Sequence, residues 1–212
     1  TDWAFSAWVK PEKASMTEKT AYIFAVNCEN GTTNCNKILF GFPKDTGKLY
    51  VYEKPTSGSE GRVLETATAM NDGEWNHVVY SRAASTGTIY LNGVSLGTHT
   101  IKHAAFVASD KWSLGQEFDG VSVTNEYVGL IDDQAVWNDD LKPSEVTSIY
   151  AGGSNLDLNI NSGNYASESN LIGYWKFDAG SDTIAYDHSG YANHAAINGA
   201  TWVSVSDSLV TP

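Results

Sequence analysis

The fold is decided by the stretch from residue 114 to residue 137, which reads LGQEFDGVSVTNEYVGLIDDQAVW. A glycine turn and two carboxylates, Glu117 and Asp119, open this stretch, and a short polar loop follows them. Residues 127–137 then alternate between apolar and polar side chains, as a β-strand with one buried face does. Neighbouring carboxylates beside a loop rich in Asn and Glu suit Ca²⁺, which binds roughly six to eight oxygens. The stretch therefore predicts a cation site at a loop carried by a rigid sheet.

Short strands are expected along the rest of the chain. Residues 5–10 and 75–82 alternate with period two, and Asn92-Gly93 is a strong hairpin signal between two short apolar runs. Many short strands joined by turns predict an all-β fold in which two antiparallel sheets pack as a sandwich. Further strands are expected over residues 21–27, 37–42, 48–52, 62–69, 88–91, 94–96, 112–114, 171–178 and 201–205.

One short helix is expected over residues 143–150, where Pro143 stands at the first helical position and Gly152-Gly153 end the helix. Lys142 is not a capping residue, so the start of this helix is expected to be poorly capped. Residues 151–170 are rich in Gly, Ser, Asn and Asp and predict a long loop. A second domain after it would hold about 40 residues, too few for a stable core. We therefore expect residues 1–212 to form a single domain.

The formal net charge is −12 at pH 7. Such a surface repels nucleic acid and anionic membranes, so we expect neither as a partner. No run of about 18 apolar residues is present, and no membrane span is expected. The chain starts at Thr1 inside an expected strand, without a signal peptide, as a processed product or an excised domain does.

The two cysteines, Cys28 and Cys35, flank a short polar loop that contains Gly31. We expect a disulfide between them, which would indicate an oxidising compartment, and two free thiols are the alternative. No histidine stands nearby at ligand spacing, so the pair is a poor zinc site.

Several motifs follow one another in a recognisable order. They are Trp75-Asn76-His77-Val78-Val79 with the hairpin at 87–94, LGQEFD at 114–119, and the strand and helix over 128–153. In this order they resemble the concanavalin A-like lectin/glucanase superfamily, in particular its laminin-G-like and pentraxin branches. The resemblance implies a jelly-roll sandwich with one short helix.

The C-terminal segment carries a second resemblance. LIGYWKFD at 171–178 and DHSGYANH at 187–194 are similar to the opening strands of laminin-G-like domains, where they come first. Here they come last. The domain is therefore circularly permuted, or residues 171–205 supply closing strands, or the chain is a fragment of a tandem array. We expect closure within one domain.

The pentraxin resemblance implies a Ca²⁺ site formed by the Glu117 and Asp119 carboxylates and the Phe118 carbonyl. We expect one ion rather than two. The alternative is that both carboxylates merely solvate a loop. The family completes this site with an Asp-Asn pair, and the matching position here is Cys35-Asn36, where the Asp is missing; Asn36 or Asn34 would have to serve, or the site is weakened. The family's ligands for a second ion lie in a loop that is shorter here and offers Asn125 and Glu126.

A second, structural Ca²⁺ is implied at Asp187 and Asn193, because laminin-G-like relatives often hold an ion near this segment. An Asx-type turn without metal is the alternative. Three aromatic residues that border the candidate loops, Trp112, Tyr127 and Tyr191, are expected to stack against sugar rings.

No catalytic motif is evident. The superfamily's glucanases use Glu-x-Asp-x-x-Glu, which is missing here, and the adjacent Asp132 and Asp133 are expected on opposite faces of a strand, where they cannot flank one glycosidic bond. We expect a non-catalytic, Ca²⁺-dependent, lectin-like domain that binds a glycan or surface polysaccharide at an extracellular, cell or virion surface. The alternative is a structural or adhesive module, such as a virion decoration protein, an appendage protein or an adhesin repeat, that binds protein partners or further copies of itself.

Overall fold

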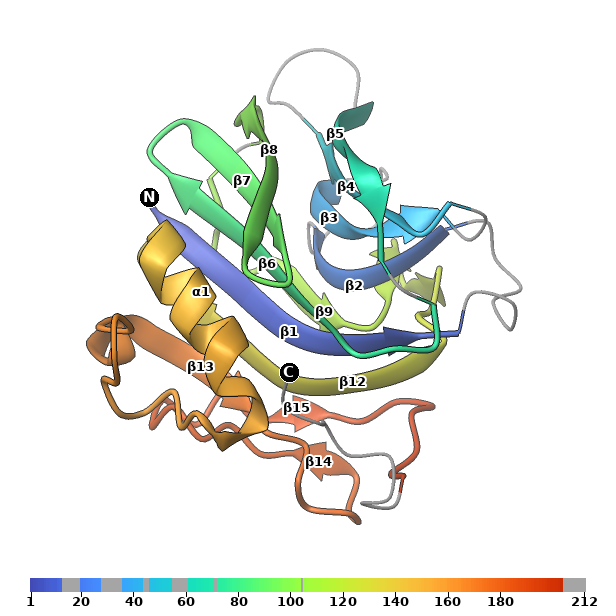
Figure 1. Cartoon of the computed structure of the whole chain (residues 1–212). Helices are drawn as coiled ribbons and strands as arrows, with labels where there is room; N and C mark the ends of the chain where they lie inside the picture. Colours follow the sequence, from blue (N-terminus) through green and yellow to red (C-terminus); the bar gives the residue numbers. More distant parts are fainter. Residues whose placement is uncertain are drawn as a thin grey trace.

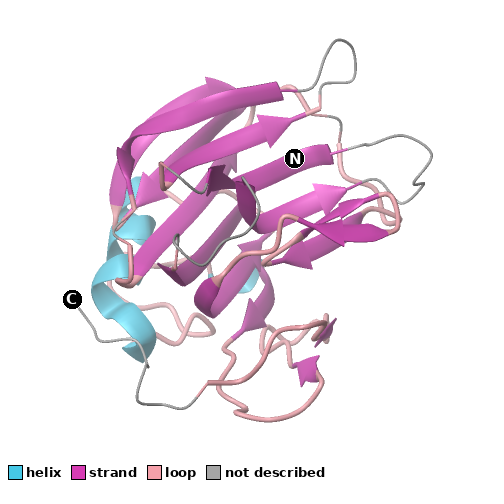
Figure 2. Ribbon diagram, turned by 90° about the vertical axis from the view of Figure 1, so that its right-hand side faces the viewer, coloured by secondary structure: helices cyan, strands magenta, loops and turns pink. Residues whose placement is uncertain are grey.

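The computed structural model describes residues 1–12, 20–27, 36–43, 46–54, 61–70, 72–103 and 105–203. Two antiparallel sheets pack face to face, which confirms the predicted jelly-roll sandwich (Figures 1 and 2). In spatial order, the six-stranded sheet consists of β13 (Leu171–Trp175), β12 (Gly129–Trp137), β1 (Trp3–Pro11), β6 (Asn76–Ala83), β7 (Thr86–Leu91) and β8 (Val94–Thr100). The five-stranded sheet consists of β5 (Gly61–Ala69), β4 (Lys48–Glu53), β3 (Asn36–Pro43), β2 (Thr20–Asn27) and β9 (Lys111–Leu114).

Smaller elements are added to the two main sheets. One hairpin is formed by β10 (Glu117–Asp119) and β11 (Ser122–Thr124), and a second two-stranded sheet by β14 (Ile184–Ala185) and β15 (Ala195–Ala196). The helices are α1 (Pro143–Gly152) and the single 3₁₀ turns η2 (Gly153–Asn155) and η3 (Glu168–Asn170). Within the described ranges, no helix has the length and apolar character needed to cross a bilayer.

The two faces of the six-stranded sheet bury different cores. On β1, Phe5 and Val9 point between the sheets and join the main core, as period-two alternation requires. Ala4 points to the opposite face, where α1 and the loop after it form a second core with Val146 and Tyr165. Figure 1 shows α1 lying across this outer face. The sandwich therefore has a third, partly helical layer on one side.

The C-terminal segment is attached to the edge of the six-stranded sheet through β13, which pairs with β12. This strand is shorter than the expected 171–178 because Phe177 adopts a left-handed φ of 54°, which ends the extended run. The strand expected over 201–205 is wrong for residues 201–203, which form no regular structure. β14 and β15 were not expected, because each has only two residues.

Helix α1 confirms the helix expected over residues 143–150 and continues to Gly152. Its start is better satisfied than expected, because Glu145 accepts a hydrogen bond from the Lys142 backbone N–H at 2.9 Å. The other carboxylate oxygen of Glu145 accepts from Ala166 N–H and the Ser167 hydroxyl. The buried Glu145 carboxylate therefore caps the N-terminus of α1 and also holds the loop after the helix by hydrogen bonds.

Gln134 is a polar residue in an apolar place. Its side chain on β12 is fully buried, and neither amide atom has a hydrogen-bond partner among the described residues. Burying such groups without partners is unfavourable by about 1–3 kcal/mol. We expect Gln134→Met, which keeps the length of the side chain, to raise the free energy of unfolding by about that amount in urea denaturation. Gln134→Glu should have the opposite effect, and a loss of stability in the Met variant would contradict this account.

Candidate functional site

The β10–β11 hairpin places Glu117 and Asp119 on one face. Both residues lie on strand β10 rather than in the expected loop, and residues two apart on a strand point the same way. In the hairpin register Glu117 lies opposite Thr124. The two-residue turn between the strands begins with Gly120, whose φ of 67° suits glycine. The sequence Asp-Gly-Val-Ser between short runs of alternating polarity is a signal that could have indicated this hairpin.

Two side chains of β11 and its end join the carboxylates. The Thr124 hydroxyl lies 3.3 Å from Asp119 Oδ2 and 3.5 Å from Glu117 Oε1, so it is shared by both acids. The Asn125 side-chain amide donates a hydrogen bond to Glu117 Oε1. Glu117 is only 3% exposed, whereas Asp119 is partly exposed. Four oxygen-bearing side chains therefore meet around one point, with a buried carboxylate beneath and a more open one beside it.

Strand β2 holds this cluster in place. Asn27 Oδ1 accepts a hydrogen bond from the Phe118 backbone N–H at 3.3 Å, which fixes the peptide between the two carboxylates. The Asn125 carbonyl accepts from the Tyr22 backbone N–H at 3.1 Å. Neither Asn27 nor Tyr22 could be predicted from the sequence, because β2 lies about ninety positions before β10 and a tertiary contact of that kind has no local pattern.

The charge of Glu117 acts on two buried tyrosines of the five-stranded sheet. Burial raises the pKa of the Tyr22 phenol, and Tyr50 and then Glu117 raise it further. Burial likewise raises the pKa of Tyr50, with a smaller contribution from Glu117 in the same direction. The carboxylate cluster therefore adjoins the outer face of the five-stranded sheet, opposite to the face that packs in the main core.

The remaining expected ligands are placed as follows. Asn36 pairs with Asn27 across β2 and β3, so its backbone adjoins the residue that holds Phe118. Its side chain lies outside the described part of the structure. Glu126 is exposed to solvent beside Asn125. Cys28, Cys35 and Asn34 lie outside the described residues.

The three expected stacking residues do not gather at the carboxylates. On β9, Lys111 and Ser113 contact the β10–β11 segment, whereas Trp112 points to the opposite side and packs against Phe24 and Phe106. Tyr127 packs against Phe42 in the main core.

Tyr191 is 58% exposed but lies on the turn after Asp187, in the C-terminal segment. The ring of Phe118, which points to the opposite face of the hairpin from the two carboxylates, lies 5.1 Å from the Lys111 ammonium.

The donor set suits a hard cation. Carboxylate, hydroxyl and amide oxygens are the ligands that Ca²⁺ prefers. Glu117, Asp119 and Thr124 bring such oxygens together, and the Asn125 side-chain amide adjoins them through its nitrogen. Among the described residues, no Lys or Arg forms an ion pair with Asp119. Glu117 and Asp119 with the Phe118 carbonyl would hold the ion, and it would supply a positive centre for oxygens of a bound ligand.

Asp187 and Asn193 form a compact turn in the C-terminal segment. The two Asp187 oxygens accept hydrogen bonds from the backbone N–H groups of Tyr174, Ser189 and Asn193 and from the Ser189 hydroxyl. Burial by itself raises the pKa of Asp187, but these hydrogen bonds outweigh it and lower the pKa. The Asn193 amide donates to Ile172 O. Because protein donors already surround this carboxylate, the geometry favours the metal-free Asx-type turn.

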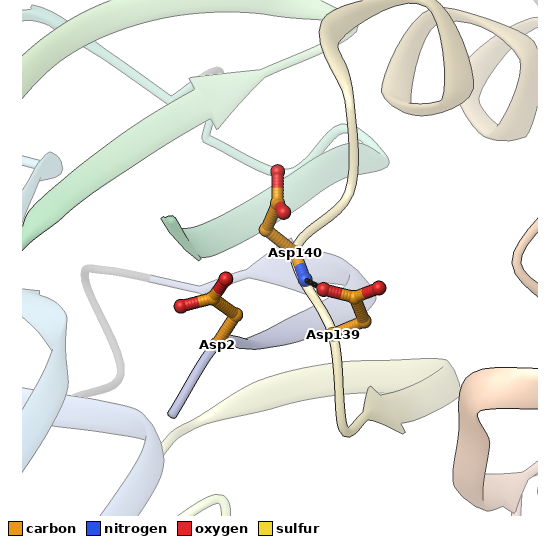
Figure 3. Close-up of side chains that lie close together, drawn as sticks. All are labelled: Asp2, Asp139 and Asp140. Atoms are coloured by element: carbon orange, nitrogen blue, oxygen red, sulfur yellow. Dashed lines mark hydrogen bonds between the residues drawn. The ribbon is translucent and has the colours of Figure 1, made fainter. Parts of the chain in front are cut away.

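A third acidic group joins the chain start to the segment after β12. Asp2, Asp139 and Asp140 bring one carboxylate oxygen each within 4.8 Å of the others (Figure 3). Each carboxylate already has a partner: Ala84 N–H for Asp2, Asp140 N–H for Asp139, and the Lys142 ammonium for Asp140. Hydrogen bonds and a lysine therefore balance this cluster within the protein.

The expectation that Asp132 and Asp133 point to opposite faces is wrong, because β12 contains a bulge. Ser6 pairs with Ala135 and Trp8 with Asp132, so two residues of β12 face one residue of β1. Asp133 adopts a left-handed φ of 46°.

Burial and the neighbouring Asp132 carboxylate raise the pKa of Asp133 to about 7, and burial raises that of Asp132 to about 6. Asp133 lines a small surface pocket with Ser6, Trp8 and Tyr174.

Solved structures share this architecture. A SAP-like pentraxin from Limulus polyphemus is 18% identical, with a TM-score of 0.51 over 78% of this chain and 72% of its own. A Bacteroides ovatus protein of proposed carbohydrate-binding function is 14% identical, with a TM-score of 0.62; the match covers 96% of this chain but 56% of that protein. The CBM40 module of the Ruminococcus gnavus IT-sialidase, solved with α2,3-sialyllactose, is 15% identical, with a TM-score of 0.60 over 70% of this chain and 82% of the module.

Sequence comparison gives the family. No curated protein sequence matches the chain. A family model described as the concanavalin A-like lectin/glucanases superfamily matches residues 1–147, which include both sheets up to β12 and the start of α1. With this match and the sandwich geometry, the chain belongs to the concanavalin A-like lectin/glucanase superfamily.

Proposed function

We propose that this chain is a non-catalytic, Ca²⁺-dependent carbohydrate-binding domain of an extracellular or surface protein. The observation that carries the proposal is the convergence of Glu117, Asp119, Thr124 and Asn125 at the β10–β11 hairpin. Membership of a superfamily of lectins and glucanases supports a glycan as the ligand. Similar folds that bind sialyllactose support the same choice.

The two carboxylates have different roles in the proposed mechanism. Glu117 is buried and held by neighbouring side chains, so it anchors the ion, whereas Asp119 is partly exposed and faces the ligand side. Glycan hydroxyls would complete the oxygen coordination that the protein leaves open.

Calcium titration by calorimetry tests the ion site. We expect heat from the wild type and at least a tenfold loss of affinity in Glu117→Gln/Asp119→Asn, which keeps the side-chain shapes but removes two charges. Asp2→Asn/Asp139→Asn is the matched control, because it removes two charges from the other acidic cluster and should leave the titration unchanged. Equal heats in the wild type and the Glu117/Asp119 variant would remove the proposed site.

A glycan array with and without chelator tests the ligand. Binding that is lost in chelator and in the Glu117→Gln/Asp119→Asn variant is the expected result. A structural or adhesive module is the second candidate, favoured by exposed apolar residues in the C-terminal segment, namely Ile184, Tyr186 and Tyr191. No glycan signal in either arm, together with a defined assembly in light scattering, would favour that second candidate.

A further inference from the structure

We propose that Asn125 is the switch of the Glu117–Asp119 site. Its amide N–H covers Glu117 in the ion-free protein, and the same amide turns over to present its oxygen when a cation binds. This inference rests on the proposed function, since it concerns how the same site accepts an ion. Its basis is the hydrogen bond that Asn125 Nδ2 donates to Glu117 Oε1.

The backbone of Asn125 is fixed while its side chain remains able to turn. Its carbonyl accepts from Tyr22 N–H of β2 at 3.1 Å, and its φ of 54° lies in the left-handed region that Asn tolerates better than most residues. A half-turn about χ2 exchanges the amide nitrogen and oxygen without moving the backbone. The switch therefore needs only one side-chain torsion.

The orientation of the amide follows from the ion-free state itself. With the oxygen toward Glu117, two acceptors would face each other, so the nitrogen must face the carboxylate when no cation is present. The Thr124 hydroxyl has one proton for two carboxylates, Glu117 and Asp119, and the Asn125 amide adds a donor to Glu117. In this arrangement a partly positive N–H group stands where a cation would bring positive charge.

When a cation binds, the favoured orientation of the Asn125 amide is reversed. A cation beside Glu117 repels the Asn125 N–H group and attracts the amide oxygen. After the half-turn, the side chain that had occupied the cation's place at Glu117 becomes a ligand of the cation. Two substitutions separate these roles. Asn125→Asp keeps a residue that tolerates left-handed φ but supplies only acceptors, and Asn125→Gly keeps the backbone conformation while removing the side chain.

The test measures ion-free stability and Ca²⁺ affinity in the same set of proteins. In EDTA, thermal unfolding should occur about 2–4 °C lower in Asn125→Gly and lower still in Asn125→Asp, where a third carboxylate faces Glu117. In calorimetric CaCl₂ titrations, Asn125→Asp should bind about tenfold more tightly than the wild type and Asn125→Gly about tenfold more weakly. The side-chain NH₂ resonance of Asn125 should shift during the wild-type titration.

A matched control separates the switch from a general effect of the substitution. Asn159 donates its amide to Asp157 Oδ1 at 3.0 Å, far from β10 in sequence. Asn159→Asp should lower ion-free stability in the same way but leave Ca²⁺ affinity unchanged.

Failure of the proposed function and failure of the Asn125 switch give different results. If the wild type binds no Ca²⁺, both the proposed function and the switch are overturned. If the wild type binds Ca²⁺ but Asn125→Asp binds no more tightly, or Asn125→Gly binds equally well, the switch alone is overturned. An NH₂ resonance that does not respond to Ca²⁺ in a binding-competent wild type also overturns the switch.

Discussion

Replacing Lys37 with methionine is expected to lower the free energy of unfolding by about 3–5 kcal/mol. The Lys37 ammonium lies 2.7 Å from Asp110 Oδ2, and the two side chains are 9% and 1% exposed. The ammonium also donates to the Ala105 carbonyl, so it ties the segment before β9 to strand β3. Removing it leaves the Asp110 carboxylate buried, with the Val107 backbone N–H as a donor. Urea denaturation of the two proteins measures the difference.

A double variant separates the loss of the Lys37–Asp110 attraction from the cost of leaving the Asp110 carboxylate buried without the lysine. Lys37→Met/Asp110→Leu removes both charges, and much of the stability should return, because buried ion pairs are often replaceable by apolar residues of similar volume. A loss below about 1 kcal/mol in the single variant would mean that this pair behaves like a surface salt bridge. The result bears on the site because β9 leads directly into the β10–β11 hairpin.

Replacing Asp133 with asparagine is expected to raise the free energy of unfolding at about pH 8 by about 2 kcal/mol and to change it little at about pH 4. The pKa of Asp133 is about 7 in the folded protein, raised first by burial and then by Asp132. An unfolded Asp has a pKa of about 3.9. Between these values the folded state holds a proton that the unfolded chain has released, so wild-type stability falls as pH rises toward 7.

The variant mimics the protonated acid at all pH values. Asn keeps an acceptor for the Tyr174 hydroxyl, which donates to Asp133 Oδ1 at 2.9 Å, and it tolerates the left-handed φ at the bulge. The full shift would correspond to a larger effect, but partial exposure of the side chain reduces it.

Urea denaturation at both pH values is the measurement, and Asp187→Asn is the control of opposite sign, because hydrogen bonds lower the pKa of Asp187. A stability difference between the wild type and Asp133→Asn that is the same at both pH values would contradict the account.

The local pattern of the chain predicted most of the sandwich. Alternation on β1 and β6 and the Asn92-Gly93 turn between β7 and β8 depend on neighbouring residues only, and each is present in the structure. The helix after β12 was predicted for the same reason. The short β10 was read as a loop, because three residues are too few for alternation to be visible.

The candidate site was predicted in part. Glu117 and Asp119 were predicted to lie together beside a loop, and the structure places them on one strand with Asn125 beside Glu117. Trp112 was expected beside the acids because it stands near them in the sequence, but alternation on β9 turns its ring to the other side of the strand. Proximity along the chain is therefore a poor guide to which face of a sheet a residue occupies.

The sequence by itself determined most of the strands, their turns and the helix, because these features follow from contacts between near neighbours. Only the tertiary structure decided that Asn27 and Tyr22 of β2 hold the hairpin and that a bulge turns Asp133 toward the pocket. Those features depend on the register between strands far apart in the chain. Register is fixed by the packing of both sheets together, which no short stretch of sequence contains.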